Sequence, residues 1–253
     1  MMKNFIKKKR VLITGATSGI GEACAKNLLA YDVELVLVAR DEEKLQMLQN
    51  KLQSKKNITI LSLDVRKQKE VTKKLSDLDI DILINSAGLA LGFEAIDEGN
   101  SLQWDEMIDT NIKGLLYVTK ILIPKMKKKE SAHIVNIGSV AGKIAYPNGA
   151  VYCATKAAVH SLGESINADL YATNVKMTTI APGAVKTNFS NIRFGGDHTK
   201  AEAVYNGFEP LVAEDIADAI VSVLNTPKHV NIQYMDIMPT AQRNPYLIYK
   251  EVK

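Results

Sequence analysis

The stretch Val11-Leu12-Ile13-Thr14-Gly15-Ala16-Thr17-Ser18-Gly19-Ile20-Gly21 begins as a short apolar strand and passes through a glycine-rich turn into a helix. Glycine at positions 15, 19 and 21 allows a tight turn and lets backbone N–H groups approach an anion closely. The N-terminus of the helix adds partial positive charge at the same place. Directly after a first strand, this arrangement is typical of a dinucleotide-binding βαβ unit, and a purely structural glycine-rich turn is the alternative.

Short β-branched runs alternate with helix-length segments along the rest of the chain. The predicted strands are 11–13, 33–38, 58–63, 80–84, 133–137, 175–180 and 230–235, and the predicted helices are 21–30, 41–53, 67–78, 104–128, 151–172 and 213–225. This alternation is typical of a parallel sheet, and the continuously apolar strands indicate that helices cover both faces. We therefore predict an α/β fold, a Rossmann-like doubly wound parallel sheet of about seven strands, in a single domain over residues 1–253.

The least regular segment of the sequence, 188–208, follows the sixth predicted strand. Ligands bind beyond the carboxyl ends of the strands in open α/β sheets. A long excursion from such a strand end is therefore a candidate substrate lid, and a surface insertion is the alternative.

The composition limits the classes of partner. Only Cys24 and Cys153 are present in 253 residues, so the sequence predicts no disulfide framework and favours the reducing cytoplasm. The net charge of +4 comes mostly from two basic runs, 7–10 and 125–129, which we interpret as solvated ends rather than nucleic-acid or membrane contacts. The sequence has no apolar run of transmembrane length, and its histidines lack metal-ligand spacing. We expect a small-molecule substrate and no bound metal.

The ends of the second and third predicted strands bear on the choice of dinucleotide. NAD enzymes usually carry an acidic residue at the end of the second strand. Here that strand is followed directly by Arg40, whose guanidinium suits the 2′-phosphate of NADP. The acidic residues 41–43 are interpreted as the start of the next helix. Asp64 could accept a hydrogen bond from the adenine amino group or cap the following helix, and chemistry alone does not separate the two.

Tyr152 and Lys156 carry the strongest chemical signal. Residues four apart on a helix share one face, so the ammonium lies near the phenol. A free tyrosine titrates near ~10, and a nearby ammonium favours the phenolate and lowers that pKa. Tyr152 could then act as a general base, or as a general acid in the reverse direction. Ser139 closes the fifth predicted strand, at the edge of the sheet where ligands bind.

From Val11 to about Pro239 the chain resembles the short-chain dehydrogenase/reductase superfamily. The resemblance rests on Thr14-Gly15-x-x-x-Gly19-x-Gly21, Asn85-x-Ala87-Gly88, Asn111, Ser139, Tyr152-x-x-x-Lys156 and Pro182-Gly183-x-x-x-Thr187. It implies an NADP-dependent oxidoreductase in which Tyr152 transfers the proton and Lys156 holds the nicotinamide ribose and lowers the pKa of the tyrosine. Ser139 would orient the substrate oxygen. Asn111 would kink its helix and anchor a water in the proton relay.

The same resemblance implies a set of cofactor-binding residues that spans the whole fold. Ser86 departs from the family pattern, which commonly has a second asparagine at that position. Val185 and Thr187 would hold the nicotinamide carboxamide. The full set is Gly15, Thr17, Ser18, Gly19, Ile20, Gly21, Arg40, Asp64, Val65, Asn85, Ser86, Ala87, Gly88, Tyr152, Lys156, Pro182, Gly183, Val185 and Thr187.

Segments 85–93, 104–119, 189–197 and 230–240 resemble more narrowly the NADP-dependent 3-hydroxy acid dehydrogenases, also described as serine or allo-threonine 3-dehydrogenases. This branch implies a substrate such as serine, allo-threonine, 3-hydroxyisobutyrate or 3-hydroxypropionate, and a homotetramer. The sequence departs from the branch at Ala181, where a glutamate is expected, and at 184–188, which is shorter and more basic than the branch pattern.

Arg193 is the predicted ligand for the substrate carboxylate. Its planar guanidinium suits a carboxylate, and the neighbouring Phe189, Ile192 and Phe194 would exclude water. A surface arginine paired with Asp197 or Glu202 is the alternative. If Arg193 has no such role, a carbonyl reductase acting on uncharged ketones or aldehydes becomes the better reading. A non-catalytic NADP-sensing protein is disfavoured because the residues for proton transfer are all kept.

Overall fold

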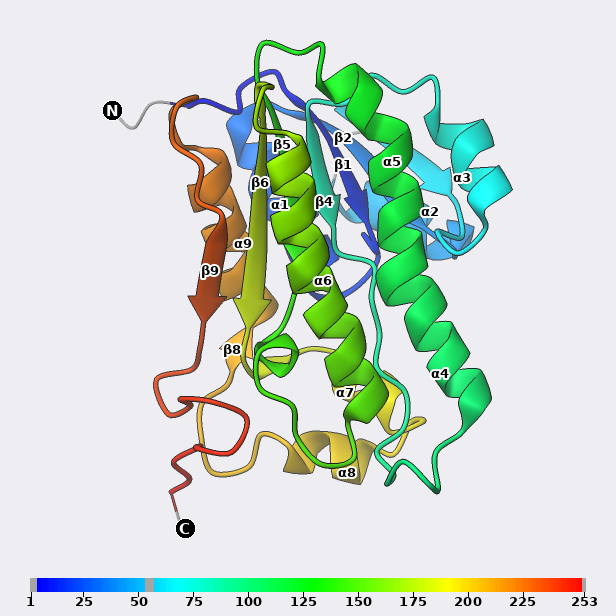
Figure 1. Ribbon diagram of the computed structural model, residues 1–253, viewed down its shortest axis with the longest axis vertical. Coiled ribbons are helices and arrows are strands. Elements are labelled where there is room, and N and C mark those ends of the chain that lie inside the picture. The colour runs from blue at the N-terminus through cyan, green and yellow to red at the C-terminus, as the bar shows by residue number, and fades with distance from the viewer. Residues whose placement is uncertain (1–3, 53–56, 252–253) are drawn as a thin grey trace.

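The computed structural model describes residues 4–52 and 57–251, and its centre is a sheet of seven parallel strands (Figure 1). The strands lie in the order β3-β2-β1-β4-β5-β6-β9, which confirms the predicted doubly wound sheet. The order of strands reverses between β1 and β4. The bounds are Arg10–Thr14 for β1, Glu34–Ala39 for β2, Ile58–Ser62 for β3, Ile82–Asn85 for β4, Ala132–Ile137 for β5, Val175–Pro182 for β6 and Tyr234–Ile237 for β9.

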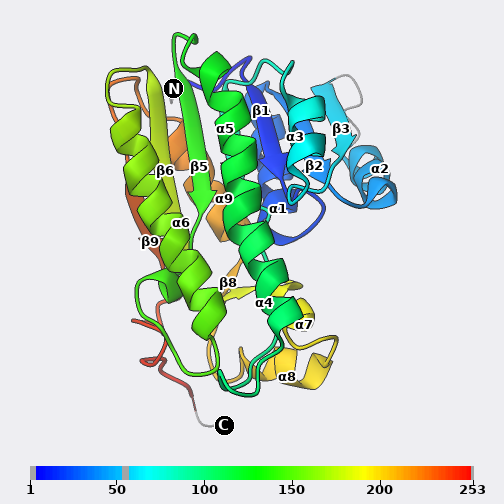
Figure 2. The same cartoon turned by 45° about the vertical axis from the view of Figure 1, so that its right-hand side comes forward.

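Helices cover both faces of the sheet (Figure 2). Successive side chains of a strand point to opposite faces, so Val11 and Ile13 pack in one apolar layer and Leu12 packs in the other. The first layer is completed by α1, α2 and α9, and the second by α3, α5 and α6. The helix bounds are Gly19–Leu28 for α1, Glu42–Lys51 for α2, Gln68–Leu75 for α3, Ser101–Ile108 for α4, Leu115–Met126 for α5, Ala150–Asp169 for α6 and Ala213–Leu224 for α9.

The single helix predicted over 104–128 is interrupted in the structure. Between α4 and α5, residues Asp109–Gly114 form a π-helical segment that contains Asn111. Such segments are rare and frequently lie at functional sites. The resemblance implied a kink of the helix at this asparagine. In the structure the distortion is a local widening of the helix into a π turn.

The last strand begins later than predicted. The sequence predicted a strand over 230–235, whereas β9 begins at Tyr234 and pairs with β6 from Thr179 onward. Val230 and Ile232 also lie beside β6, but their carbonyls accept hydrogen bonds from side chains. Lys176 Nζ donates to the Val230 carbonyl and Thr178 Oγ1 to the Ile232 carbonyl, so no regular backbone ladder forms there.

The irregular segment 188–208 lies beyond the carboxyl ends of the strands, as predicted (Figure 1). It contains two short helices, α7 (Phe189–Arg193) and α8 (His198–Ala203), joined through Gly195 and Gly196 with positive φ angles. A two-stranded sheet of β7 (Val185–Lys186) and β8 (Leu211–Val212) closes its base. Within residues 4–52 and 57–251, no helix has the length and apolar character needed to cross a membrane.

Candidate active site

The turn between β1 and α1 packs directly against the end of β4. Thr14 Oγ1 accepts hydrogen bonds from the backbone N–H groups of Ser86 and Ala87, both at 3.1 Å. Gly15 has a φ of +66°, and a Cβ atom there would lie 2.9 Å from the Ala87 backbone. A Cβ atom on Gly21 would lie 2.3 Å from the Gly15 carbonyl oxygen. Glycine is therefore required at both positions, and the bare backbone at the N-terminus of α1 suits a pyrophosphate.

A cleft of about 180 Å³ opens at this edge of the sheet and collects most of the predicted site residues. It lies where the strand order reverses, which is the usual ligand-binding place in such folds. Its predicted lining residues are Gly15, Ser18, Gly19, Ile20, Ser86, Ala87, Gly88, Ser139, Tyr152, Lys156, Pro182, Gly183, Val185 and Thr187. Phe189 and Ile192, which the sequence predicted to exclude water beside Arg193, also line the cleft. The sequence did not single out the remaining lining residues, Ile137, Gly138 and Asn188.

Six predicted cofactor residues do not line the cleft: Thr17, Gly21, Arg40, Asp64, Val65 and Asn85. The Asn85 side chain is buried and donates to Thr119 Oγ1 at 3.0 Å and to Asn136 Oδ1 at 2.9 Å. These hydrogen bonds connect β4 to β5 and α5, so the side chain has a structural role in the interior of the fold. Val65 is also buried, against the π-helical Gly114.

Arg40 lies on the surface at the end of β2, where a 2′-phosphate is expected. Its side chain is 56% exposed, and its Nη1 lies 3.4 Å from Glu106 Oε1. Arg66 Nη1 approaches the same oxygen at 3.1 Å. Two guanidinium groups therefore share one carboxylate oxygen, and the second of them was not predicted. Asp41 accepts from the Lys44 N–H at the start of α2, which confirms its predicted capping role.

Asp64 is bound by Arg66 and does not cap α3, whose N-cap is Lys67. Arg66 Nη2 lies 2.7 Å from Asp64 Oδ2, and the Arg66 backbone N–H also donates to this carboxylate. Burial raises the pKa of Asp64, but the hydrogen bonds from Arg66 outweigh it and hold that pKa below its ordinary value. The carboxylate of Asp64 is therefore ionised, and it already accepts hydrogen bonds from Arg66.

Tyr152 and Lys156 lie on one face of α6 and are both buried, as their spacing predicts. Lys156 Nζ donates to the Ile137 carbonyl at 2.8 Å and lies 6.0 Å from the centre of the Tyr152 ring. Burial lowers the pKa of Lys156 to about 8. The ammonium is thus directed at the end of β5 rather than at the phenol.

The pKa of Tyr152 is raised above its ordinary value, mainly by burial and next by Tyr146. A hydrogen bond with Ser139 and the charge of Arg193 act in the opposite direction. That Lys156 lowers the pKa of Tyr152 stays a prediction. The groups that favour the phenolate are Ser139 and Arg193.

Asn111 holds the backbone after β4. Its Oδ1 accepts from the Leu89 N–H at 2.9 Å, and its Nδ2 donates to the Leu89 carbonyl at 2.8 Å and to Thr155 Oγ1 at 3.0 Å. A Cβ atom on Gly88 would lie 3.2 Å from Asn111 Oδ1 and 3.5 Å from Lys156 Nζ. The absence of a side chain at Gly88 leaves space beside both groups, where the resemblance implies a relay water.

Arg193 lies inside an aromatic cage beside Tyr152. Its Nη1 donates to the Tyr146 hydroxyl at 2.7 Å and its Nε to the Gly92 carbonyl at 3.3 Å. The guanidinium carbon lies 4.7 Å from the centre of the Phe93 ring and 5.6 Å from that of Tyr152. The remaining nitrogen, Nη2, is buried and has no hydrogen-bond partner in the part of the chain that the structure describes.

The alternative surface pairing of Arg193 is not what the structure contains. Asp197 caps α8 by accepting from the Lys200 N–H, and Glu202 pairs with Lys186 at 2.7 Å. Tyr146 was missed because it lies in an irregular loop that has no periodic pattern. Phe93 belongs to the segment 85–93 that carried the narrower resemblance, which was the one available signal for it.

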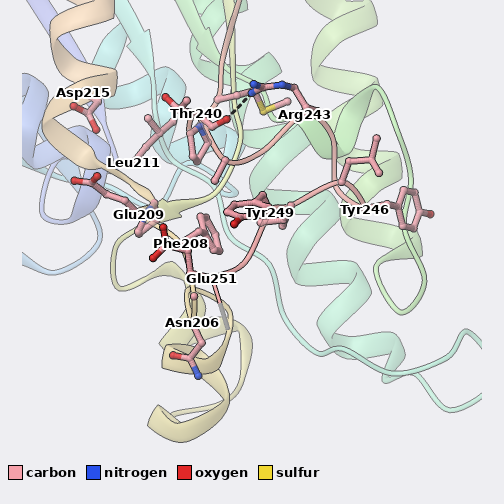
Figure 3. Close-up of a pocket in the computed structure, with 17 residues that line it drawn as sticks. Asn206, Phe208, Glu209, Leu211, Asp215, Thr240, Arg243, Tyr246, Tyr249 and Glu251 are labelled. Carbon is pink, nitrogen blue, oxygen red and sulfur yellow. Dashed lines mark hydrogen bonds between the residues drawn. The ribbon is translucent and has the colours of Figure 1, made fainter. Parts of the chain in front are cut away.

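A second cavity, of about 1580 Å³, lies between the residues around β8 and the segment that follows β9 (Figure 3). Phe208, Leu211 and Tyr249 are among the residues that line it, and Arg243 Nη1 donates to the Thr240 carbonyl at 2.6 Å at its edge. The predicted site residues do not line this cavity. The chemistry therefore belongs to the smaller cleft.

Comparison with known proteins agrees with this geometry. The family model described as short chain dehydrogenase matches residues 9–194. The chain is 42% identical over 238 residues to the NADP-dependent 3-hydroxy acid dehydrogenase YdfG of Escherichia coli (strain K12), covering 92% of this chain and 95% of that protein. It is 40% identical over 238 residues to Sulfoacetaldehyde reductase 2 of Chromohalobacter salexigens, covering 92% and 94%.

Among solved structures, the closed form of serine dehydrogenase complexed with NADP+ is similar over 96% of this chain and 100% of that one, with a TM-score of 0.90 and 40% identity. The serine dehydrogenase of Escherichia coli aligns over 92% and 99%, with a TM-score of 0.81 and 37% identity. The family match spans most of the chain, and these relatives cover nearly all of it. The chain belongs to the short-chain dehydrogenase family.

Proposed function

We propose that the chain transfers a hydride between NADP and the 3-hydroxyl or 3-oxo group of a small hydroxy acid. Serine, allo-threonine, 3-hydroxyisobutyrate and 3-hydroxypropionate are the candidate substrates. The cofactor is NADP, which the similar 3-hydroxy acid dehydrogenase and serine dehydrogenase use according to their names. The guanidinium groups of Arg40, which follows β2, and Arg66, which follows β3, lie together at Glu106 and supply the positive charge that a 2′-phosphate needs.

The cleft residues divide the work of the reaction. The glycine-rich turn and the N-terminus of α1 hold the pyrophosphate, and Lys156 holds the nicotinamide ribose. NADP supplies or accepts the hydride. Tyr152 takes the proton from the substrate hydroxyl during oxidation and returns it during reduction. Ser139 donates a hydrogen bond to the substrate oxygen and stabilises the charge that develops there.

The observation that supports an acidic substrate is the free nitrogen of Arg193. A buried guanidinium nitrogen without a partner is costly, and an anion bound between Arg193 and Tyr152 would satisfy it. The aromatic rings around the guanidinium exclude water, which strengthens a charge-assisted hydrogen bond. A β-hydroxy acid carries its carboxylate two carbons from the reacting hydroxyl, and the guanidinium of Arg193 lies beside Tyr152, 5.6 Å from the centre of its ring.

The test is an NADP-coupled absorbance assay over small 3-hydroxy acids, sulfoacetaldehyde and uncharged alcohols or aldehydes. We expect Arg193→Met to raise KM for the anionic substrates by about tenfold to a hundredfold, the loss of roughly 1.5–3 kcal/mol for a hydrogen bond to a charged group. The KM for uncharged substrates should change by less than about twofold. Arg243→Met, at the second cavity, is the matched control and should leave both classes unchanged.

Two results would overturn the proposal. Equal losses for anionic and uncharged substrates would mean that Arg193 supports the site without binding a carboxylate. Wild-type activity confined to uncharged compounds would favour the carbonyl reductase instead. A preference for sulfoacetaldehyde would mean that Arg193 binds a sulfonate instead of a carboxylate, since the oxygens of both groups accept hydrogen bonds from a guanidinium.

The proposal also includes a homotetramer in the cytoplasm, as the narrower resemblance implies. The two cysteines of the chain are free and buried, which suits a reducing compartment. β9 forms an edge of the sheet with part-exposed side chains, and an uncovered strand edge is a surface on which another subunit can pack.

A further inference from the structure

The loop that carries Ser139 is held by hydrogen bonds from side chains on two successive turns of α6. Lys156 donates to the Ile137 carbonyl at 2.8 Å. One turn later, His160 Nε2 accepts a hydrogen bond from the Ser139 backbone N–H at 3.3 Å. Tyr152, Lys156 and His160 are spaced by four and therefore share one face of the helix. His160 is only 7% exposed, so the bond to Ser139 is protected from water.

The imidazole of His160 fits between two glycines that flank Ser139. A Cβ atom on Gly138 would lie 2.5 Å from its Nε2, and one on Gly142 would lie 2.8 Å from its Cε1. The loop therefore approaches the ring more closely than any other residue would permit. Such contact on both sides leaves Ser139 little freedom to move toward or away from α6.

The hydrogen bonds also assign the proton on the ring. Nε2 accepts from Ser139, so it carries no proton, and the proton of neutral His160 lies on Nδ1. The Tyr234 hydroxyl, on β9, lies 2.7 Å from Nδ1 and 2.9 Å from Nε2. The hydroxyl is almost equidistant from the two nitrogens and the two rings meet edge to face at 88°, so Tyr234 packs against the face of the imidazole. Lys143 Nζ lies 4.1 Å above the Tyr234 ring and pairs with Asp236, which holds the tyrosine in place.

We propose that His160 is a positioning residue that sets Ser139 for the substrate oxygen, through the hydrogen bond that its Nε2 accepts from the Ser139 amide. The inference rests on the proposed function in that Ser139 binds the reacting oxygen. Burial, together with the charges of Lys156 and Lys143, lowers the pKa of His160 to about 4. The ring is therefore neutral near pH 7 and remains able to accept the bond.

The kinetic test compares His160→Leu, which cannot accept a hydrogen bond, with His160→Gln, whose amide oxygen can. We expect His160→Leu to lower kcat by about tenfold to a hundredfold, the scale for a displacement of a reacting group by about 1 Å. NADP affinity and substrate KM should change by less than about twofold, because neither rests on the Ser139 amide. His160→Gln should recover most of the lost kcat.

His133→Leu is the matched control. His133 is also a buried histidine, bonded to Thr178 Oγ1 at 2.8 Å, but it lies at the opposite end of β5 from Ser139. Its replacement should lower stability and leave kcat within about twofold of wild type. Equal losses of kcat in His133→Leu and His160→Leu would overturn the proposal, as would a His160→Gln variant no better than His160→Leu.

A second measurement needs no substrate. Hydrogen–deuterium exchange of the NADP-bound protein, resolved to the Ser139 amide, should be slow in wild type and His160→Gln and at least about tenfold faster in His160→Leu, because the amide loses its acceptor. Unchanged exchange in His160→Leu would overturn the positioning role. If the wild type turns over no hydroxy acid but the exchange pattern holds, the proposed substrate class is wrong and the role of His160 stands.

Discussion

At the scale of single residues, Tyr152 is held among groups with opposed effects on its proton. Burial and Tyr146 raise its pKa, whereas the Ser139 hydrogen bond and the charge of Arg193 lower it. Arg193 would therefore have two effects: it binds the substrate carboxylate, and its charge favours the phenolate of Tyr152. Once a carboxylate neutralises Arg193, the phenol should hold its proton more firmly.

Tyr152→Phe isolates the proton-transferring oxygen. The ring packing against Phe189, at 5.5 Å between ring centres, is kept, so the fold and the cofactor affinity should be preserved. Turnover should fall by about 10²–10⁴-fold, the usual contribution of a general acid or base. Steady-state kinetics and NADP titration by fluorescence check the two expectations. A variant that retains turnover within a few-fold of wild type would remove Tyr152 from the mechanism.

The residue patterns that sequence reasoning resolved are local ones. Tyr152 and Lys156 share a face because the helix has a fixed period, and the glycines of the first turn are dictated by backbone contact with Ala87. The cage around Arg193 could not be derived in this way. It joins α7 to the loops that carry Phe93 and Tyr146, and their approach depends on the packing of the whole fold.

At the scale of elements, α6 and the α4–α5 run together determine the shape of the cleft. α6 contributes the proton-transferring tyrosine, the lysine and His160 on successive turns. The π-helical segment between α4 and α5 turns Asn111 toward Leu89 and Thr155. The helical period predicted a continuous run over 104–128. It could not predict the π segment, because that segment is stabilised by tertiary hydrogen bonds rather than by periodicity.

Asn111→Ala tests this element. The change leaves the Leu89 N–H and carbonyl and Thr155 Oγ1 without their buried partner, so the free energy of unfolding should fall by about 2–3 kcal/mol. Turnover should also fall, because the loop from Gly88 to Leu89 borders the cleft. Urea denaturation and steady-state kinetics give the two values. Asn136→Ala, a buried amide in the sheet, should lose stability and keep its turnover; parallel losses of turnover in both variants would make the role of Asn111 structural only.

At the scale of the whole molecule, the parallel sheet brings distant segments to one edge. The ends of β1, β4, β5 and β6 meet there, which is why residues from Gly15 to Thr187 line one cleft. The sequence predicted this gathering because strands and helices alternate regularly. It did not predict the surface pair of Arg66 and Glu106, because side-chain pairs between α4 and the loop after β3 leave no periodic signal.

The sheet also buries histidines, and this makes the stability of the molecule depend on pH. Burial and the charge of Lys176 lower the pKa of His133 to about 3, and the pKa of His160 is lowered to about 4. Unfolded histidines titrate near ~6.5, so below that pH the unfolded chain binds protons that the folded chain refuses. Their contribution is complete above about pH 6.5 and is lost as the pH falls through the folded pKa values.

We therefore expect the free energy of unfolding to decrease between pH 6.5 and 5, before most carboxylates titrate, by up to about 1.4 kcal/mol per pH unit for each of the two histidines. Urea denaturation at several pH values measures the slope. His133→Leu should lower stability at pH 7 and flatten the slope, because one of the two proton-refusing groups is gone. His229→Leu, at an exposed position, should keep the wild-type slope. Parallel curves for the wild type and His133→Leu would show that His133 takes up its proton equally in both states, which its burial at the amino end of β5 does not allow.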